Sequence, residues 1–169
     1  MRLARGMRNG AEGRCVSDAA PALELGPARK KDLEKLVDLL GVLFAQEADF
    51  VPDAAKQRRA LEAILADPRI GRIYVAREGD RVVGMVSTLY TISTAEGGKA
   101  AWLEDRVVLP ECRGRGIGAA LLSHAVVGSR DEGCLRLTLL SDEDNDLAHA
   151  VYASEGFQFS GMRPMRLKL

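Results

Sequence analysis

Arg113-Gly114-Arg115-Gly116-Ile117-Gly118 follows the apolar run 107–109 and precedes the helical pattern 119–122. A strand that enters a helix through glycines directs several unpaired backbone N–H groups, and the positive end of the helix dipole, at one point. Glycines let a bulky anion approach the main chain, and the two arginines add charged donors. This hexapeptide therefore predicts a phosphate-binding turn. The alternative is a glycine-rich turn with two solvated arginines.

Length and composition are those of one domain. The chain has 169 residues, with 24 Lys and Arg against 24 Asp and Glu, so its formal net charge is zero. Neutrality gives no bulk attraction to nucleic acid or to an anionic membrane, and no apolar run reaches the about 18 residues of a membrane span. We expect neither nucleic-acid nor membrane partners, and any anion binding must be local.

The cysteines and the first residues point to the cytoplasm. Cys15, Cys112 and Cys134 are far apart and lack CxxC spacing, which predicts reduced thiols in a cytoplasmic protein and no metal site. Residues 1–21 carry arginines among small and polar residues, without the apolar core of a signal peptide. We expect a disordered extension over 1–21 and a single domain over 22–169.

Hydrophobic periodicity predicts the order β-α-α-β-β-β-α-β-α-β-β. Apolar residues recur at spacings of three and four in the predicted helices, and they alternate in most predicted strands. Helices are predicted over 33–44, 53–66, 117–129 and 145–155, and strands over 23–25, 72–77, 81–92, 100–109, 135–139, 157–161 and 165–169. This α/β order predicts a mixed, mostly antiparallel sheet of six or seven strands, flanked by about four helices.

Two other classes of phosphate site fit less well. A P-loop needs Gly-Lys-Ser/Thr, and this chain has Gly118-Ala119-Ala120 there. The spacing of Gly114, Gly116 and Ala119 formally matches a dinucleotide-binding Rossmann motif. That motif should open a series of parallel strands, however, and here three hairpin-linked strands precede it. A dinucleotide-binding oxidoreductase remains a remote alternative.

Two separated patterns resemble the GNAT superfamily of acetyl-CoA-dependent N-acetyltransferases. The first is Arg113-x-x-Gly116-x-Gly118, and the second is Asn145-x-x-Ala148-x-x-x-Tyr152-x-x-x-Gly156-Phe157. The resemblance covers residues 23–169 and the order of elements. Cys112 departs from it, because an aromatic residue is usual at that position.

The resemblance implies a GNAT fold and an acetyl-CoA site without metal. The loop Arg113, Gly114, Arg115, Gly116, Ile117 and Gly118 would hold the pyrophosphate of coenzyme A. The pantetheine arm would lie along the strand of Arg106, Val107 and Val108, where unpaired backbone groups suit its amides. Asn145 would bond the arm from the other side, and it would also serve as a helix N-cap. Tyr152 would protonate the departing thiolate, although a core tyrosine is the alternative.

The acceptor side of the site is predicted at Glu104 and Asp105. Strict alternation puts Glu104 with Trp102 and Asp105 with Leu103 and Val107, so either face carries a charge among apolar neighbours. This indicates a functional carboxylate or a β-bulge, and the resemblance implies both. The segment 103–105 resembles polyamine and glucosamine-phosphate acetyltransferases, in which the carboxylates face the acceptor. Glu104 is then the candidate base for an alkylammonium, with Asp105 as helper or acceptor ligand. Solvated acids are the alternative.

Acceptor choice in such proteins is set by the first two helices, which here offer Phe44 and Asp49. We expect a small primary amine and direct transfer in a ternary complex, with the N–H of Val107 or Val108 facing the oxyanion. A protein N-terminus or lysine is the alternative acceptor, and a noncatalytic acyl-CoA-binding module is the alternative class. Dimerisation is common among these proteins, so a homodimer is a candidate state.

Overall fold

The computed structural model of the protein describes residues 22–47 and 50–168. The predicted extension 1–21, Asp49 and Leu169 lie outside the described residues. In chain order the elements are β1 (Leu23–Pro27), η1 (Lys30–Asp32), α1 (Leu33–Phe44), α2 (Ala54–Ala66), β2 (Gly71–Glu78), β3 (Arg81–Ser93), β4 (Gly98–Val108), η2 (Pro110–Cys112), α3 (Ile117–Asp131), β5 (Leu137–Leu139) and α4 (Asp146–Ser154).

One sheet of five strands, in the order β1-β2-β3-β4-β5, forms the middle layer. The first four strands are antiparallel, and β5 runs parallel to β4 after the chain crosses over through α3. The two-residue turn between β2 and β3 contains Gly79 with a φ of 59°, a left-handed conformation that favours glycine. The mixed, mostly antiparallel sheet flanked by helices, expected from the order of elements, is thereby confirmed, with five strands in the described residues instead of six or seven.

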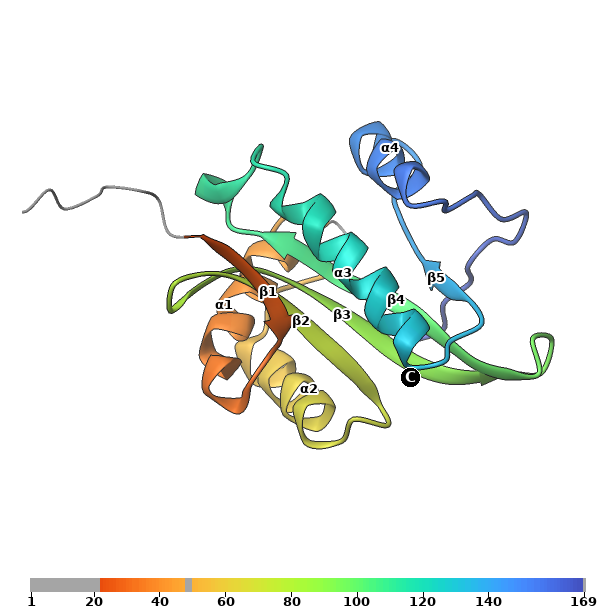
Figure 1. Ribbon diagram of the computed structural model, residues 1–169, viewed down its shortest axis with the longest axis horizontal. Coiled ribbons are helices and arrows are strands. Elements are labelled where there is room, and N and C mark those ends of the chain that lie inside the picture. The colour runs from red at the N-terminus through yellow and green to blue at the C-terminus, as the bar shows by residue number, and fades with distance from the viewer. Residues whose placement is uncertain (1–21, 48–49, 169) are drawn as a thin grey trace, which may run out of the picture.

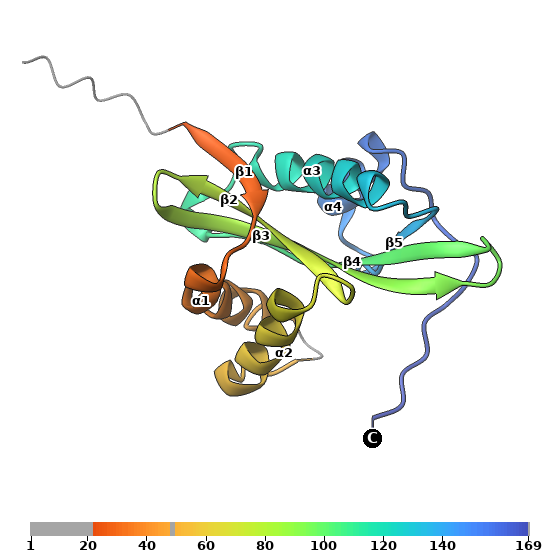
Figure 2. The same ribbon diagram turned by 60° about the horizontal axis from the view of Figure 1, so that its bottom comes forward.

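Helices cover both faces of the sheet. Figures 1 and 2 show α1 and α2 on one face and α3 and α4 on the other. The apolar stripe of α1, with Leu36, Leu39 and Leu40 almost fully buried, packs on the first face. Leu121 and Leu122 of α3 pack on the second face. The sheet therefore separates two hydrophobic cores, which we call the α1/α2 core and the α3 core.

Local signals explain where several elements begin. The carboxylate of Asp53 accepts hydrogen bonds from the N–H groups of Ala55 and Lys56, so it caps α2. The buried carboxylate of Asp32 accepts hydrogen bonds from both Nη atoms of Arg77, at 2.9 and 2.8 Å. These bonds connect the start of α1 to β2. This charged pair was not predicted from the sequence.

The last two predicted strands are wrong for the described residues. Strands were expected over 157–161 and 165–169, but residues 157–168 belong to no strand. Phe159 and Met165 are 85% and 97% exposed, so the segment buries too little apolar surface to hold it in a sheet. Pro164 lacks an N–H for a ladder, and β5 offers only three residues as a neighbour. Figure 2 shows this segment running round the β5 edge toward the α1 and α2 side.

Candidate active site

A β-bulge in β4 sets the geometry of the site. Val86 of β3 lies opposite two residues of β4, Asp105 and Arg106. Asp105 has a φ of 52°, the one positive φ of a non-glycine residue in the described chain. Aspartate tolerates this left-handed conformation better than most residues. The sequence left open a bulge or a functional carboxylate, and the bulge is present.

The bulge changes which side chains share a face. Alternation predicted Leu103 and Val107 on the same face, and this is wrong, because Leu103 packs in the α3 core and Val107 in the α1/α2 core. One extra residue shifts the phase of a strand by half a period. Glu104 and Arg106, which a regular strand would place on one face, therefore lie on opposite faces of the sheet.

Asp105 is held on the α1/α2 side by a buried hydroxyl. Ser87 Oγ lies 3.3 Å from Asp105 Oδ2 and 3.1 Å from the main-chain oxygen of Glu104. Burial, and secondarily the negative charge of Glu104, raises the pKa of Asp105 to about 6, while the Ser87 hydroxyl acts in the opposite direction. Glu104 itself is exposed. The pKa of Asp105 is thus raised toward neutral pH.

The glycine loop ends in an uncapped helix N-terminus. Gly114 and Gly116 have φ values of 72° and 77°, which is the reason that glycine is needed at both positions. Within residues 22–47 and 50–168, no side chain accepts a hydrogen bond from the first turn of α3, which begins at Ile117. A Cβ added to either glycine would meet no atom within 4 Å. Backbone N–H groups and open space are therefore available to an anion, as the sequence predicted.

The two arginines of this loop have partners within the protein. Arg113 Nε donates to the main-chain oxygen of Val108 at 3.1 Å, and its Nη2 contacts Gln46 Oε1 at 3.2 Å. Arg115 Nη2 pairs with Glu78 Oε1 at 2.5 Å. An anion at the loop would therefore meet backbone groups first, and the arginines would have to exchange partners to reach it.

Helix α4 supplies the other wall of the site. Asn145 Oδ1 accepts a hydrogen bond from the N–H of Ala148 at 3.1 Å, so Asn145 caps the helix. Tyr152 lies two turns further along, and the guanidinium carbon of Arg106 lies 4.7 Å from its ring centroid. The ring of Phe157 lies on another side of Tyr152, at 6.0 Å between centroids.

A groove of about 2150 Å³ brings some of the predicted site residues together. Its walls include Phe44, Glu104, Asp105, Arg106, Asn145 and Tyr152. Val107, Val108 and the loop 113–118 do not line this groove, although they continue the chain directly from the bulge. The carboxylates and the phenol thus share one hollow, and the glycine loop lies beyond it.

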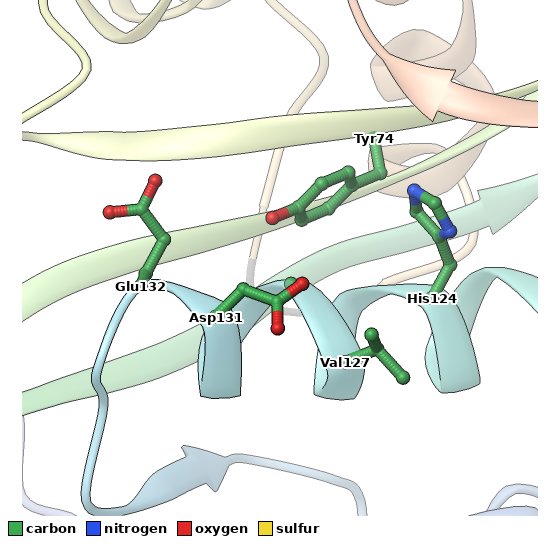
Figure 3. A pocket seen from close by; sticks show the side chains of 6 residues that line it. Tyr74, His124, Val127, Asp131 and Glu132 are labelled. Carbon is green, nitrogen blue, oxygen red and sulfur yellow. The ribbon is translucent and has the colours of Figure 1, made fainter.

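A second, smaller cavity lies elsewhere. It measures about 250 Å³ and shares no lining residue with the groove. Figure 3 shows Tyr74 reaching from β2 toward His124 and Asp131 of α3. Burial raises the pKa of Tyr74 to about 12, and the Glu132 carboxylate at the rim is paired with Lys99. Tyr74 and Glu132 are therefore poor candidates for proton transfer near neutral pH.

Two site features were missed in the sequence. Ser87 is a polar residue in the apolar run of β3, and it is 1% exposed. Its position in that run was the available signal, because a buried hydroxyl needs a partner. No pattern indicated that Arg106 would face Tyr152, since the contact joins residues 46 positions apart. Among the described residues, no group of three or more His, Cys, Asp or Glu could hold a metal ion.

Comparison with known proteins identifies the class of enzyme. The sequence matches the Acetyltransferase (GNAT) family over residues 36–157, so the chain belongs to this family and is an acyltransferase. It is 30% identical over 146 residues to an aminoalkylphosphonate N-acetyltransferase of Salmonella typhimurium, covering 86% of this chain and 92% of that one. It is 31% identical over 153 residues to a glucosamine 6-phosphate N-acetyltransferase of Trypanosoma brucei brucei, covering 87% and 96%.

Solved structures show the same fold. An integron cassette protein from the Cole Harbour Salt Marsh metagenome superposes with a TM-score of 0.75 at 31% identity, covering 86% of this chain and 90% of that one. A predicted acetyltransferase of Clostridium acetobutylicum, solved with acetyl-CoA, gives a TM-score of 0.70 at 18% identity, covering 87% and 96%. No helix within the described ranges is long and apolar enough to cross a membrane.

Proposed function

We propose that the protein transfers the acetyl group of acetyl-CoA to a primary amine in a direct ternary complex. The amine nitrogen attacks the thioester carbon, the C–N bond forms and the C–S bond breaks. One proton leaves the amine and one joins the sulfur. The observation that carries the proposal is that two carboxylates and a tyrosine line one groove on either side of the β4 bulge.

The donor side of the site fits coenzyme A. The uncapped first turn of α3 suits a pyrophosphate, since its N–H groups and the glycine loop leave open space there. The N–H of Leu109 donates to Val83 of β3, so by alternation the N–H of Val108 points away from β3, toward the side of β5. This supports Val108, rather than Val107, as the main-chain donor to the thioester oxygen. The Asn145 side-chain oxygen caps α4, so its NH₂ group would donate to the pantetheine arm.

The difference in burial between Glu104 and Asp105 supports an exchange of their predicted roles. The sequence predicted Glu104 as the base. Asp105, with its pKa raised to about 6, accepts a proton from an ammonium group more readily than an ordinary exposed acid does. Exposed Glu104, at the groove wall, serves better as an ion-pair partner for the incoming ammonium. Tyr152 delivers the second proton to the sulfur.

The charges of the groove favour a small amine that carries a second polar group. Glu47, Glu104 and Asp105 offer negative charge to an ammonium group. Lys56, on α2, also lines the groove and offers positive charge. The aminoalkylphosphonate and glucosamine 6-phosphate named for the two relatives combine an amine with an anion, which such a groove can accommodate.

An amine panel tests the proposal. Purified protein is mixed with acetyl-CoA and, in turn, an aminoalkylphosphonate, glucosamine 6-phosphate, spermidine, an aminoglycoside and a lysine peptide, and the released thiol is measured. We expect release above the no-enzyme rate with at least one small amine. Release with the peptide alone would favour a protein acetyltransferase. Binding of acetyl-CoA without release in any arm would favour an acyl-CoA-binding module.

A further inference from the structure

The guanidinium of Arg106 is a half-buried cation without a carboxylate partner. Its Nη1 makes one long hydrogen bond, 3.4 Å, to the main-chain oxygen of Gly118 in the first turn of α3. Its Nε is buried and has no hydrogen-bond partner among the residues described. No ion pair of Arg106 occurs in that part of the chain. A cation in this position carries a desolvation cost that neither contact offsets well.

The strongest contact of Arg106 is with the ring of Tyr152. The guanidinium carbon lies 4.7 Å from the ring centroid, within the range of a cation–π interaction, which strengthens when the cation is desolvated. Phe157 also contacts this ring, at an interplanar angle of 62°. The Tyr152 ring is thus in contact with both a cation from β4 and an aromatic residue after α4.

The start of α3 leaves room for this arrangement. A Cβ on Gly118 would lie 3.4 Å from Arg106 Nη1, in ordinary van der Waals contact, so Arg106 packs directly against the first turn of α3. Arg106 therefore links three elements: β4 through its backbone, α3 through Gly118 and α4 through Tyr152. The bulge makes this link geometrically possible, because the extra residue moves Arg106 off the face that Glu104 occupies and onto the α3 side.

We propose that Arg106 is a positioning residue that fixes the Tyr152 ring so that its hydroxyl meets the departing sulfur. This inference rests on the proposed role of Tyr152 as the proton donor. Without the guanidinium, the ring gains rotational freedom, and a smaller fraction of bound complexes has the hydroxyl in place. Misplacement of a reacting group lowers turnover more than it lowers cofactor affinity.

The test separates turnover from binding in a set of variants. Arg106→Met removes the cation and keeps an unbranched side chain, whereas Arg106→Lys keeps the charge without the planar guanidinium. Lys99→Met is the matched control, since Lys99 Nζ lies 3.9 Å from the ring centroid of Tyr90, outside the groove. For each variant, kcat, the Kd of coenzyme A by calorimetry and the thermal unfolding midpoint are measured.

We expect Arg106→Met to lower kcat roughly tenfold, with the Kd of coenzyme A changed less than about twofold. Arg106→Lys should recover part of the loss, and Lys99→Met should keep the wild-type kcat. In the Tyr152→Phe background, Arg106→Met should cause no further loss, because both changes act on one hydroxyl. Arg106→Lys also provides the comparison if Arg106→Met does not fold.

Three results would overturn the inference, and they differ in what else they contradict. An unchanged kcat in Arg106→Met, or a loss confined to the Kd, contradicts the role of Arg106 alone. If the kcat losses of Arg106→Met and Tyr152→Phe multiply in the double variant, this also contradicts the role of Arg106 alone. An unchanged kcat in Tyr152→Phe contradicts the proton donor in the proposed function, and the role of Arg106 falls with it.

Discussion

Replacing Asp105 with Asn should stabilise the folded protein while removing most of its activity. The pKa of this carboxyl is raised from 3.8 to about 6 by burial and by the charge of Glu104. At about 1.4 kcal/mol per pKa unit, the ionised form costs the folded state up to about 3 kcal/mol. Asparagine adopts a positive φ at least as readily as aspartate and can accept the Ser87 hydrogen bond.

The size of the stability gain in Asp105→Asn depends on pH. Well below the ordinary pKa of 3.8 the carboxyl is protonated in both the folded and unfolded states, so the wild type has the full stability of the neutral form. As the pH rises toward the folded-state pKa of about 6, the unfolded state releases its proton first, and this stability is lost. Asp105→Asn abolishes the loss. We expect a gain of about 1–3 kcal/mol at pH 8 and almost none at pH 4.

Urea unfolding at pH 4 and pH 8, followed by circular dichroism, measures the difference. Asp38→Asn is the matched control, because Asp38 lies on the exposed side of α1 and pairs only with Lys35 at 3.6 Å, among the contacts found in the described chain. It should change the free energy of unfolding little at either pH. The acetyltransfer rate of Asp105→Asn should fall by about 10²-fold or more. A variant that is less stable at pH 8, or whose gain is equal at both pH values, would refute the reasoning.

Three further substitutions have defined outcomes. Gly116→Ala puts a side chain at a φ of 77° and should weaken coenzyme A binding in calorimetry, whereas Gly26→Ala, with open space and no positive φ, should leave it intact. Arg77→Leu leaves the carboxylate of Asp32 buried without its partner and should lower the free energy of unfolding by about 3 kcal/mol in a urea titration. Gly128→Ala would make a Cβ overlap with the phenol oxygen of buried Tyr74. The unfolding midpoint of this variant should therefore fall, while its kcat per folded molecule is retained.

The sequence predicted those elements whose signals are local. The hairpin between the strands predicted over 72–77 and 81–92 turns at Gly79, and the helix predicted from residue 53 is capped by Asp53, so each depends on a few consecutive residues. The glycine loop is similar, because the positive φ at Gly114 and Gly116 is a property of the backbone itself. From these signals the order of elements and the family could be predicted together.

The remaining features depend on partners that are distant in the sequence. The face that Asp105 occupies is set by the register between β3 and β4, so alternation alone gave the wrong neighbours for Leu103 and Val107. The two closing strands were predicted from a pattern that does not reveal whether a neighbouring strand exists. With β5 only three residues long and Pro164 inside the segment, the pattern was insufficient.

The bulge explains how a strand with consecutive charged residues can serve both halves of one reaction. A regular strand would place Glu104 and Arg106 together on one face and Asp105 on the other. With the extra residue, Glu104 and Asp105 both lie on the α1/α2 side, where Asp105 bonds Ser87 and an amine would enter, and Arg106 contacts Tyr152 on the opposite side. The proposed base and the proposed acid then approach the reacting carbon from different directions, which proton removal from nitrogen and proton delivery to sulfur require. A positive φ at Asp105 costs of order 1 kcal/mol, and this division of charge gives the strain a functional reason.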